Sequence, residues 1–568
     1  MPAGTNVLFD GGIPPPYYPD VLPVISAKQM REIDRLTTEE HGVPSLTLME
    51  AAANACFLEL EKRYSAKLAD QRVCVLCGPG NNGGDGAALA QMLSAAGAKP
   101  QVVLFGRVDD TQGDARTNFE RVQKLSKDLD KQITFVECTT SQEWKGIWQS
   151  ATSFDVVVDA LFGTGLSRPL DGLFAEVVQD LAMTKEPPNF PFILSVDIPS
   201  GLNSDSSQLI GPAVEADLTV TFTAPKLANV EPPASRSNSK LVIANIGSPN
   251  HLLQRIASEL LVIEEEDARR WLISTRYTPD SFKNTHGHVL VIAGSRGYTG
   301  AAVLCGNAAM RAGAGLTTIA TPHSAQATIA ATAMPEVMTT ALAETDRGAV
   351  SDAAIEHLLQ LASKATVVAI GPGLTSADER TRNFVHAVVA QRRTPVVIDA
   401  DGLNCLAPWP HTLSGASEFP IVLTPHPGEM LRLLGTGDKT KLDDRANTAR
   451  RFAASNKVIL VLKGSPTLIA APDGRVFINT SGNAGLGTAG AGDTLTGLIA
   501  GFIAQEFAQT NRNPDVLQAT IAALHVGGLA GELAAERLGM RSMVASDIRE
   551  HIGPAMCLLD PLGEGFKK

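Results

Sequence analysis

The chain has 568 residues, more than one hydrophobic core usually contains, and this length predicts roughly two to four domains. Its hydrophobic content of 44% and charged content of 19% are typical of an ordinary globular protein. The net charge of −12, without a dense run of Lys and Arg, argues against a surface for nucleic acid or for an anionic membrane.

Cysteine usage and the chain ends narrow the class further. The seven cysteines show no disulfide spacing. Cys74-x-x-Cys77 falls within a predicted buried strand, and no second pair or nearby His completes a metal site, so we interpret both as structural. No apolar run reaches the ~20 residues of a membrane span, and the N-terminus lacks a basic segment followed by an apolar one. We therefore expect a cytoplasmic protein.

The first half of the chain predicts a parallel sheet. Residues 1–25 are rich in Pro and Gly and predict a flexible leader. Apolar residues at helical spacing predict helices at 27–40, 46–60 and 86–96. Strands are predicted at 72–77, 101–105, 133–136, 155–159, 192–197, 218–222 and 241–246. This alternation is typical of an α/β fold with a doubly wound, mostly parallel sheet.

Three polar motifs follow predicted strands of this half. They are GPGNNGGDG at 78–86, DALFGTGL at 159–166 and DIPSG at 197–201. Each one alone could be a turn with a capping Asp or Asn. Since the carboxyl ends of parallel strands meet at one sheet edge, three such ends predict a ligand site there.

A second α/β series begins after a domain boundary near residue 258. The charged stretch at 264–270 (EEEDARR) predicts a connecting helix with a solvated face. Helices are predicted at 301–312 and 446–456, and no internal repeat relates the two halves. Strands are predicted at 289–293, 317–321, 367–370, 395–398, 421–424, 458–462 and 476–479.

Motifs of the same kind follow the strands of the second half. They are GSRGYTGA at 294–301, GPG at 371–373, DADGLN at 399–404, TPHPGE at 424–429 and KGSPT at 463–467. The chain then passes through GTAGAGDTLTG at 487–497 into an apolar helical run at 495–507. A glycine loop at a helix N-terminus favours phosphate, and Asp493 in the first turn is either a cap or a carboxylate directed at the ligand.

These motifs carry a resemblance to known families. KG-x-x-T, a hairpin and then G-x-G-D at a helix start resemble ribokinase-like phosphotransferases. More narrowly, residues 78–202 resemble the epimerase that repairs hydrated NADH and NADPH, written NAD(P)HX, and residues 294–497 resemble the nucleotide-dependent NAD(P)HX dehydratase. The resemblance covers about 26–560. It implies a Rossmann-like epimerase domain at 26–258 and a ribokinase-like dehydratase domain at 259–568.

The resemblance to the dehydratase assigns a chemical role to Asp493. It implies that Asp493 takes the proton of the C6 hydroxyl of NAD(P)HX as that hydroxyl attacks the terminal phosphate of ADP or ATP, supplied with Mg²⁺. The phosphate ester then leaves and NAD(P)H is restored. The substrate contacts would be Ala302, Gly373, His426 and Asp493, and the nucleotide contacts would be Lys463, Gly464, Ser465, Pro466, Thr467 and Gly492.

The resemblance to the epimerase makes Asp197 the acid/base that interconverts the R and S hydrates. Oxygens of Asn82, Asp159 and Ser200 would hold K⁺, a hard cation that prefers such ligands. The hydrate itself would contact Asn81, Asn82, Gly83, Gly84, Asp85, Gly163, Thr164, Gly165, Leu166, Ser167, Arg168, Pro169 and Asp197.

Two alternatives remain open from the sequence. The chain could be a ribokinase-like small-molecule kinase, and its N-terminal half could be a non-catalytic binding module. A kinase leaves a stable phosphorylated product, whereas the dehydratase releases phosphate and NAD(P)H. The presence of Asp85, Asp159 and Asp197 together argues against a non-catalytic first half. We expect small-molecule substrates and a homo-oligomer, with neither nucleic acid nor membrane as a partner.

Overall fold

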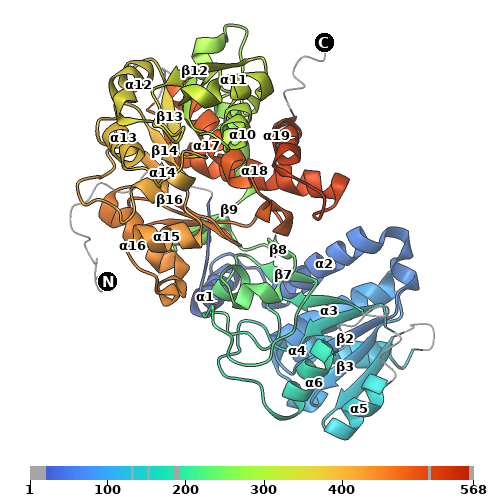
Figure 1. The fold of residues 1–568 in the computed structure, drawn as a ribbon. Coiled ribbons are helices and arrows are strands. Elements are labelled where there is room, and N and C mark those ends of the chain that lie inside the picture. Colours follow the sequence, from blue (N-terminus) through green and yellow to red (C-terminus); the bar gives the residue numbers. More distant parts are fainter. Residues whose placement is uncertain are drawn as a thin grey trace, which may run out of the picture. The chain divides into compact units, whose positions relative to one another are not determined.

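The structure is a computed structural model that describes residues 21–128, 133–149, 154–183, 191–256, 258–509 and 513–561. Most of the predicted leader, residues 1–20, lies outside this part of the chain. The described residues form two compact units, one from Leu22 to Ser258 and one that starts at Glu259 (Figure 1). Each unit is described below by itself.

The N-terminal unit is built on a wholly parallel sheet. Its strand order is β4-β3-β2-β5-β6-β7-β8. The chain lays β3 and β4 on one side of β2 and then crosses to β5 on the other side, so the switch point lies between β2 and β5. The strands are β2 (Val73–Cys77), β3 (Gln101–Phe105), β4 (Thr134–Cys138), β5 (Val156–Ala160), β6 (Phe192–Val196), β7 (Leu218–Phe222) and β8 (Leu241–Ala244).

Helices cover both faces of this sheet, as β2 illustrates. Val73, Val75 and Cys77 belong to one buried cluster with α2, α3 and α4, whereas Cys74 and Leu76 belong to a second cluster with α5 and α6. Cys74 and Cys77 therefore serve different cores, and both are free and buried. The helices are α1 (Ala27–Glu39), α2 (Ser45–Tyr64), α3 (Asn81–Ala95), α4 (Gly113–Leu125), α5 (Ser141–Gln149), α6 (Gly172–Met183), α7 (Leu227–Val230) and α8 (Asn250–Gln254).

Helix α3 begins five residues before the predicted start at residue 86. Its first turn is the glycine motif itself, which low helix propensity had suggested to be a loop. A Cβ on Gly83 would stand 1.8 Å from the carbonyl oxygen of Gly78, and one on Gly84 would stand 2.8 Å from Cα of Ala115. The glycines thus let the helix start against the strand loop and α4, so the motif presents a helix N-terminus to the switch point.

The C-terminal unit has a larger mixed sheet in the order β9-β18-β17-β16-β15-β14-β13-β10-β11-β12. All neighbours are parallel except that β17 is antiparallel to β16 and β18. The switch point lies between β10 and β13, and the two mostly parallel sheets confirm the predicted fold class. The strands are β9 (Leu260–Ile263), β10 (His288–Ile292), β11 (Leu316–Pro322), β12 (Val337–Leu342), β13 (Val367–Ile370), β14 (Val396–Ile398), β15 (Ile421–Leu423), β16 (Ile459–Leu462), β17 (Thr467–Ala470) and β18 (Val476–Asn479).

Figure 1 shows α10, α17, α18 and α19 on one face of this sheet and α12 to α16 on the other. The helices are α9 (Glu265–Ser274), α10 (Thr299–Arg311), α11 (His323–Thr332), α12 (Ile355–Ala362), α13 (Glu379–Ala390), α14 (Ala400–Cys405), α15 (Pro427–Leu433), α16 (Arg445–Asn456), α17 (Ala491–Ala508), α18 (Val516–Leu538) and α19 (Ala545–Leu559).

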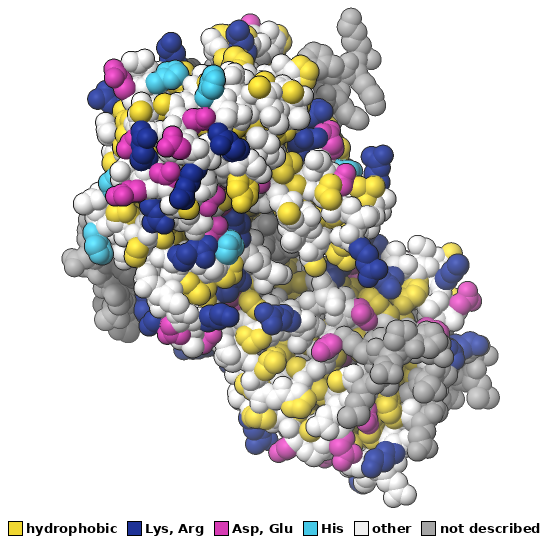
Figure 2. Space-filling model, in the orientation of Figure 1, with side chains coloured by type: hydrophobic (Ala, Val, Ile, Leu, Met, Phe, Trp, Pro, Cys, Tyr) yellow, Lys and Arg dark blue, Asp and Glu magenta, His cyan; other side chains and the backbone are white. Residues whose placement is uncertain are grey.

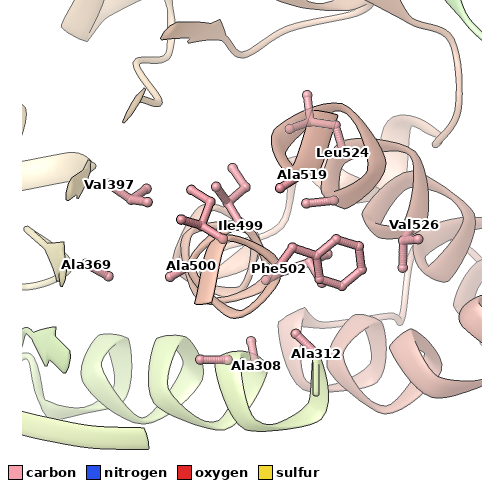
Figure 3. Close-up of a cluster of buried hydrophobic side chains, with 14 of the residues drawn as sticks. Ala308, Ala312, Ala369, Val397, Ile499, Ala500, Phe502, Ala519, Leu524 and Val526 are labelled. Atoms are coloured by element: carbon pink, nitrogen blue, oxygen red, sulfur yellow. The ribbon is translucent and has the colours of Figure 1, made fainter. Parts of the chain in front are cut away.

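Helix α17 is the central helix of this unit. Figure 3 shows Ile499, Ala500 and Phe502 between side chains of α10, α18 and the sheet. The approach to α10 is close enough that a Cβ on Gly497 would stand 2.0 Å from the carbonyl oxygen of Cys305, and one on Gly501 would stand 2.6 Å from the Ala312 methyl. This packing fixes the N-terminus of α17 in space.

Helix α9 matches the predicted helix at 264–270 only in part, because Glu265 and Glu266 are exposed but the helix also has a buried face. Asp267 and Trp271 are buried, and the Trp271 ring stacks on Phe502 with centroids 4.1 Å apart. Its indole Nε1 donates to Glu506 at 2.9 Å. Asp267 also caps the helix, since the backbone N–H of Glu264 donates to its side chain.

Helix α18 is the one described helix whose length and composition would allow it to cross a membrane, although the sequence had predicted no such run. Two thirds of its apolar window, 67%, is buried inside the unit. It packs on α17, α19 and β18, which accounts for its apolar composition. On the visible face, Lys, Arg, Asp and Glu are mixed and form no single basic field (Figure 2).

Candidate active sites

Asp493 is the third residue of α17, whose N-cap position is Gly490. No described residue donates a hydrogen bond to its carboxylate, so it is not a helix cap. Burial raises its pKa to about 6, with Asp399 adding to the rise and Lys463 opposing it. The structure thus places a carboxylate of near-neutral pKa at a helix N-terminus.

Lys463 and the buried Asp399 form a partly buried ion pair beside this helix. Lys463 directly follows β16, and its Nζ donates to Asp399 Oδ1 at 2.7 Å, with Glu429 at 4.0 Å. Thr496 of α17 donates to the other oxygen of Asp399 at 2.8 Å. Burial alone would lower the pKa of Lys463, but the carboxylates of Asp399 and Glu429 outweigh it and raise that pKa. Lys463 therefore remains a cation at the loop.

The glycine loop before α17 lies beside the ammonium group of Lys463. The position that a Cβ on Gly492 would occupy lies 3.4 Å from Lys463 Nζ and 3.7 Å from Asp399 Oδ2. Arg445 of α16 fixes the 463–467 loop, because its Nη2 donates to the carbonyl oxygens of Pro466 at 3.0 Å and Lys463 at 3.4 Å. A cation, free helix N–H groups and a carboxylate thus converge, which suits a phosphoryl group in transfer.

The switch point of this sheet joins the loops after β10 and β13. The hydroxyl of Ser295 donates to the carbonyl oxygen of Gly373 at 2.8 Å, and Gly294 N–H donates to Pro372 at 2.8 Å. Gly373 has φ +64°, a conformation that favours glycine. These two loops border the crevice in which α/β sheets bind ligands.

His426 caps α15. Nδ1 of its imidazole accepts from the backbone N–H of Gly428 at 3.0 Å. The backbone N–H of His426 donates to the Glu429 carboxylate at 2.8 Å, which completes a capping box. The imidazole is half exposed, so it can still contact a ligand. The structural role that the sequence allowed for is present, and substrate contact stays a prediction.

In the N-terminal unit, Asp197 follows β6 and is paired with Lys226. Lys226 Nζ donates to Asp197 Oδ1 at 2.7 Å and to the hydroxyl of Thr221 at 3.0 Å. The other oxygen, Oδ2, accepts from Thr164 N–H at 3.2 Å. Asp197 has φ +65°, unusual for a residue with a side chain and common at functional sites. Lys226 is fully buried.

Asp159 lies at the tip of β5 and is fully buried. Its carboxylate accepts from the hydroxyl of Ser195 at 2.7 Å and from the hydroxyl and N–H of Ser200 at 2.5 and 2.9 Å. Burial raises its pKa, and these hydrogen bonds oppose the rise. No described Lys, Arg or His forms an ion pair with Asp159.

The loop after β5 brings Asn82 and Asp197 together. The position that a Cβ on Gly163 would occupy lies 2.8 Å from Asn82 Oδ1 and 2.9 Å from Asp197 Oδ2. Nδ2 of Asn82 is buried and has no hydrogen-bond partner among the residues that the structure describes. A single candidate site at the switch point is thus bordered by the first turn of α3, the 163–169 loop and the tip of β6.

Two further carboxyls belong to the surroundings of Asp197. Asp34 of α1 has a buried oxygen without a partner, and burial raises its pKa to about 6, with Lys226 opposing and Asp197 adding to the rise. Burial, Asp197 and Asp34 together raise the pKa of Asp85 well above its usual range. The charge of Asp197 therefore acts on both Asp34 and Asp85, while Lys226 pairs with Asp197 and also acts on Asp34.

Two known protein families match this chain, one in each of its two units. A family model described as YjeF-related protein N-terminus matches residues 45–228, and one described as NAD(P)H-hydrate dehydratase matches residues 289–554. The chain is similar to the bifunctional NAD(P)H-hydrate repair enzyme Nnr of Moorella thermoacetica, at 39% identity over 93% of this chain and 96% of the relative. The chain belongs to the family of bifunctional NAD(P)H-hydrate repair enzymes.

Other members of this repair-enzyme family match over similar lengths. The enzyme of Thermofilum pendens is 36% identical over 94% of this chain and 96% of its own, and that of Escherichia coli is 30% identical over 92% of each. Among solved structures, an ADP/ATP-dependent NAD(P)H-hydrate dehydratase from Bacillus subtilis, co-crystallised with ATP and Mg²⁺, is 30% identical. It covers 53% of this chain and 98% of its own, with a TM-score of 0.44.

The residues predicted for the epimerase site border the switch point between β2 and β5, whereas Lys463 to Thr467 follow β16, three strands beyond β13. In the N-terminal unit the outer part of the 163–169 loop, Ser167 to Pro169, is exposed, whereas Leu166 is buried. Ala302 lies in α10 and is fully buried, and its contact with the hydrate stays a prediction.

Sequence reasoning missed several residues of both sites. Lys226 follows β7 by four residues and carries no glycine motif, so it was not singled out. Asp399 stood within the DADGLN motif, directly after a strand, and that position was the available signal. The others are Asp34, Thr221, Glu429, Arg445 and Thr496.

Proposed function

We propose that the chain repairs hydrated nicotinamide dinucleotides in two steps, one in each unit. The N-terminal unit interconverts R- and S-NAD(P)HX, and the C-terminal unit converts S-NAD(P)HX to NAD(P)H with ADP or ATP. The observation that carries the proposal is that Asp493, Lys463 and Gly492 converge at the N-terminus of α17 in a chain related over almost its whole length to repair enzymes.

The dehydration begins with proton transfer to Asp493. As its carboxylate takes the proton of the C6 hydroxyl, the hydroxyl oxygen attacks the terminal phosphorus, and the bond to the bridging oxygen breaks to release AMP or ADP. The ring nitrogen lone pair then expels phosphate from C6, and loss of a proton from C5 restores the double bond of NAD(P)H. A positioned general base of this kind typically contributes ~10²–10⁴-fold.

Lys463 and the N–H groups at the start of α17 stabilise charge on the transferred phosphoryl group. The ion pair with Asp399 fixes the ammonium group, and Arg445 fixes the loop that follows it. The described residues contain no group of three or more His, Cys, Asp or Glu side chains arranged to hold a metal ion. We therefore assign Mg²⁺ to the phosphates of the incoming nucleotide.

The epimerisation requires the C6–oxygen bond to break and re-form on the opposite face of the ring. Asp197 is placed to give a proton to the departing hydroxyl and to take one from the water that returns. Its Oδ1 is held by Lys226 and Thr221, whereas Oδ2 faces the place beside Gly163 and Asn82. Lys226 thereby orients the carboxylate for reaction through Oδ2.

The set predicted for K⁺ fits a monovalent hard cation. Asp159 is a buried carboxylate without a cationic partner, and Ser200 and Asn82 add oxygens. A bound cation would supply positive charge for Asp159 and for the phosphates of the hydrate. Asp159→Ala should therefore weaken hydrate binding and abolish any K⁺ dependence of the KM. Thr139→Ala, at an exposed position directly after the edge strand β4, should leave both unchanged.

The deciding experiment supplies a mixed R/S hydrate with ADP or ATP and Mg²⁺ and records the absorbance of the restored dihydronicotinamide. Full conversion with stoichiometric phosphate release supports both steps. A stable phosphorylated product would instead favour the small-molecule kinase. Conversion that stops when the S hydrate is consumed would make the N-terminal unit a non-catalytic module.

A further inference from the structure

The C-terminal unit contains a cavity of about 580 Å³ that none of the predicted site residues lines. Two arginines line it from different helices, Arg382 on α13 and Arg432 on α15. Around them the wall includes Ser376, Asn404, Pro408 and Thr436. The cavity therefore combines two cations with neutral polar and apolar groups.

Neither arginine has a carboxylate partner among the described residues. Nε of Arg382 donates to the carbonyl oxygen of Ser376 at 2.7 Å, and Nε of Arg432 donates to Asn404 Oδ1 at 2.8 Å. The Nη groups of both arginines bond no described residue. Both arginines are exposed, and the fork geometry of a guanidinium group matches phosphate. The cavity wall therefore offers two cations to an anionic ligand.

The cavity adjoins the catalytic centre through α14. At the start of this helix lie Asp399, paired with Lys463, and Asp401, whose charge contributes to the raised pKa of Asp493. At its end Asn404 faces the cavity and donates to Asp401 at 3.3 Å. Six residues of α-helix span roughly 9 Å. Asn404, which accepts from Arg432, thus lies about one short helix from Asp399 beside the reacting carboxylate.

A second connection runs through α15. The position that a Cβ on Gly428 would occupy lies 2.8 Å from Cε1 of His426 and 3.7 Å from Nη1 of Arg432. The His426 imidazole, which is predicted to contact the hydrate, therefore lies close to the Arg432 guanidinium group of the cavity. The nucleotide loop at 463–467 contributes no residue to the cavity wall.

We propose that this cavity receives a phosphate group of the dinucleotide substrate while its nicotinamide ring lies at Asp493. The inference rests on the proposed dehydration. The hydrate carries a pyrophosphate, and the phosphorylated form adds a ribose 2′-phosphate, so either group supplies the required anion. The phosphates of ADP or ATP are assigned to the separate loop beside Lys463. Arg382 and Arg432 then set the affinity for the substrate rather than the rate of its chemistry.

The test compares KM and kcat for NADHX and NADPHX in Arg382→Gln, Arg432→Gln and the double variant. The control is Arg380→Gln, which removes an arginine of the same helix that pairs with Asp352 outside the cavity. We expect the KM to rise about tenfold in each single variant with kcat within twofold, because charge-assisted contacts in the ground state are lost. Arg382→Lys should restore part of the affinity.

The two hydrates separate the two sources of phosphate. A KM rise for NADPHX alone identifies the 2′-phosphate, and an equal rise for both identifies the pyrophosphate. Calorimetry with NADP⁺ and NAD⁺ measures binding without turnover, and the double variant should bind the affected dinucleotide at least tenfold more weakly. Unchanged KM and unchanged binding in the double variant overturn the inference. A wild-type enzyme that dehydrates no hydrate overturns the proposed function instead, and the calorimetry still decides on the cavity.

Discussion

Lys463 Nζ lies 2.7 Å from Asp399 Oδ1, so the lysine beside the glycine loop is paired with Asp399 and not with Asp493. Asp493 is consequently half-buried without a hydrogen-bond donor among the described residues, and its partial burial raises its pKa to about 6. A carboxylate in this state can accept a proton at neutral pH and release it again, as a general base requires.

The first prediction concerns this base directly. Asp493→Asn keeps the size of the side chain and removes its ability to take a proton, so dehydration of S-NAD(P)HX should fall by ~10²-fold or more. Epimerisation should stay at the wild-type rate, because Asp197 lies in the other unit. Asp346→Asn, at an exposed position of the same unit, is the control. Dehydration within threefold of wild type would remove Asp493 from this role.

The second prediction is the pH dependence of dehydration. Only the ionised form of Asp493 accepts a proton, so kcat/KM should fall about tenfold per pH unit below a midpoint near pH 6. Initial rates with S-NAD(P)HX at saturating nucleotide, measured between pH 5 and 8, check this. A profile that stays flat down to pH 5 would contradict the raised pKa.

The third prediction concerns stability at the same residue. A carboxyl whose pKa is about 6 in the folded state, against 3.8 ordinarily, binds its proton more tightly when folded. Its charge therefore opposes folding at pH 7, and the effect disappears as the pH falls through 6 toward 4. Asp493→Asn should raise the free energy of unfolding of the C-terminal unit by on the order of 1–3 kcal/mol at pH 7. Denaturant melts at pH 7 and pH 4.5 should show this gain shrinking; a constant gain would argue against it.

The fourth prediction tests the pair in the N-terminal unit. Lys226→Met leaves Asp197 buried without its cation, which should destabilise the unit by ~3–5 kcal/mol and abolish epimerisation. Adding Asp197→Asn to Lys226→Met should recover much of the stability and none of the activity. Lys240→Met, at an exposed position, is the matched control. Wild-type epimerisation by Lys226→Met would exclude the proposed orientation of Asp197.

The fifth prediction isolates Asp197. In Asp197→Asn, epimerisation should fall by ~10²-fold or more while dehydration of pure S-hydrate is unchanged. A mixed hydrate should then stall once its S fraction is consumed, apart from spontaneous epimerisation. Full conversion at a rate beyond that background would assign the proton transfer to another group, of which Asp34 is the first candidate.

The parts of both sites that the sequence predicted are those that directly follow strands. Asp159 and Asp197 could be predicted because the carboxyl ends of parallel strands share an edge. Asp493 could be predicted because it follows a glycine loop at a helix N-terminus, an arrangement that favours phosphate. Lys226 escaped because its long side chain reaches Asp197 from a loop without a motif. No pattern of spacing records such a contact.

Other differences have similar physical origins. The start of α3 was misplaced because propensity counts against glycine, whereas tertiary packing requires it there. The buried face of α9 was hidden by its charged first turn, in which Glu265 and Glu266 are exposed while Asp267 caps the helix. Strand β12 lies at the sheet edge and is partly exposed, so it lacks the apolar run of a central strand.

The close approach of α10 and α17 at Gly497 and Gly501 has a consequence for inactivation by heat. The first turn of α17 holds Asp493, and the rest of the helix is locked between two helices and the sheet. The carboxylate of Asp493, the proposed general base, therefore keeps its position while the core stays intact. Loss of dehydration on heating should coincide with melting of the C-terminal unit, and a thermally stressed enzyme should be a mixture of fully active and unfolded molecules.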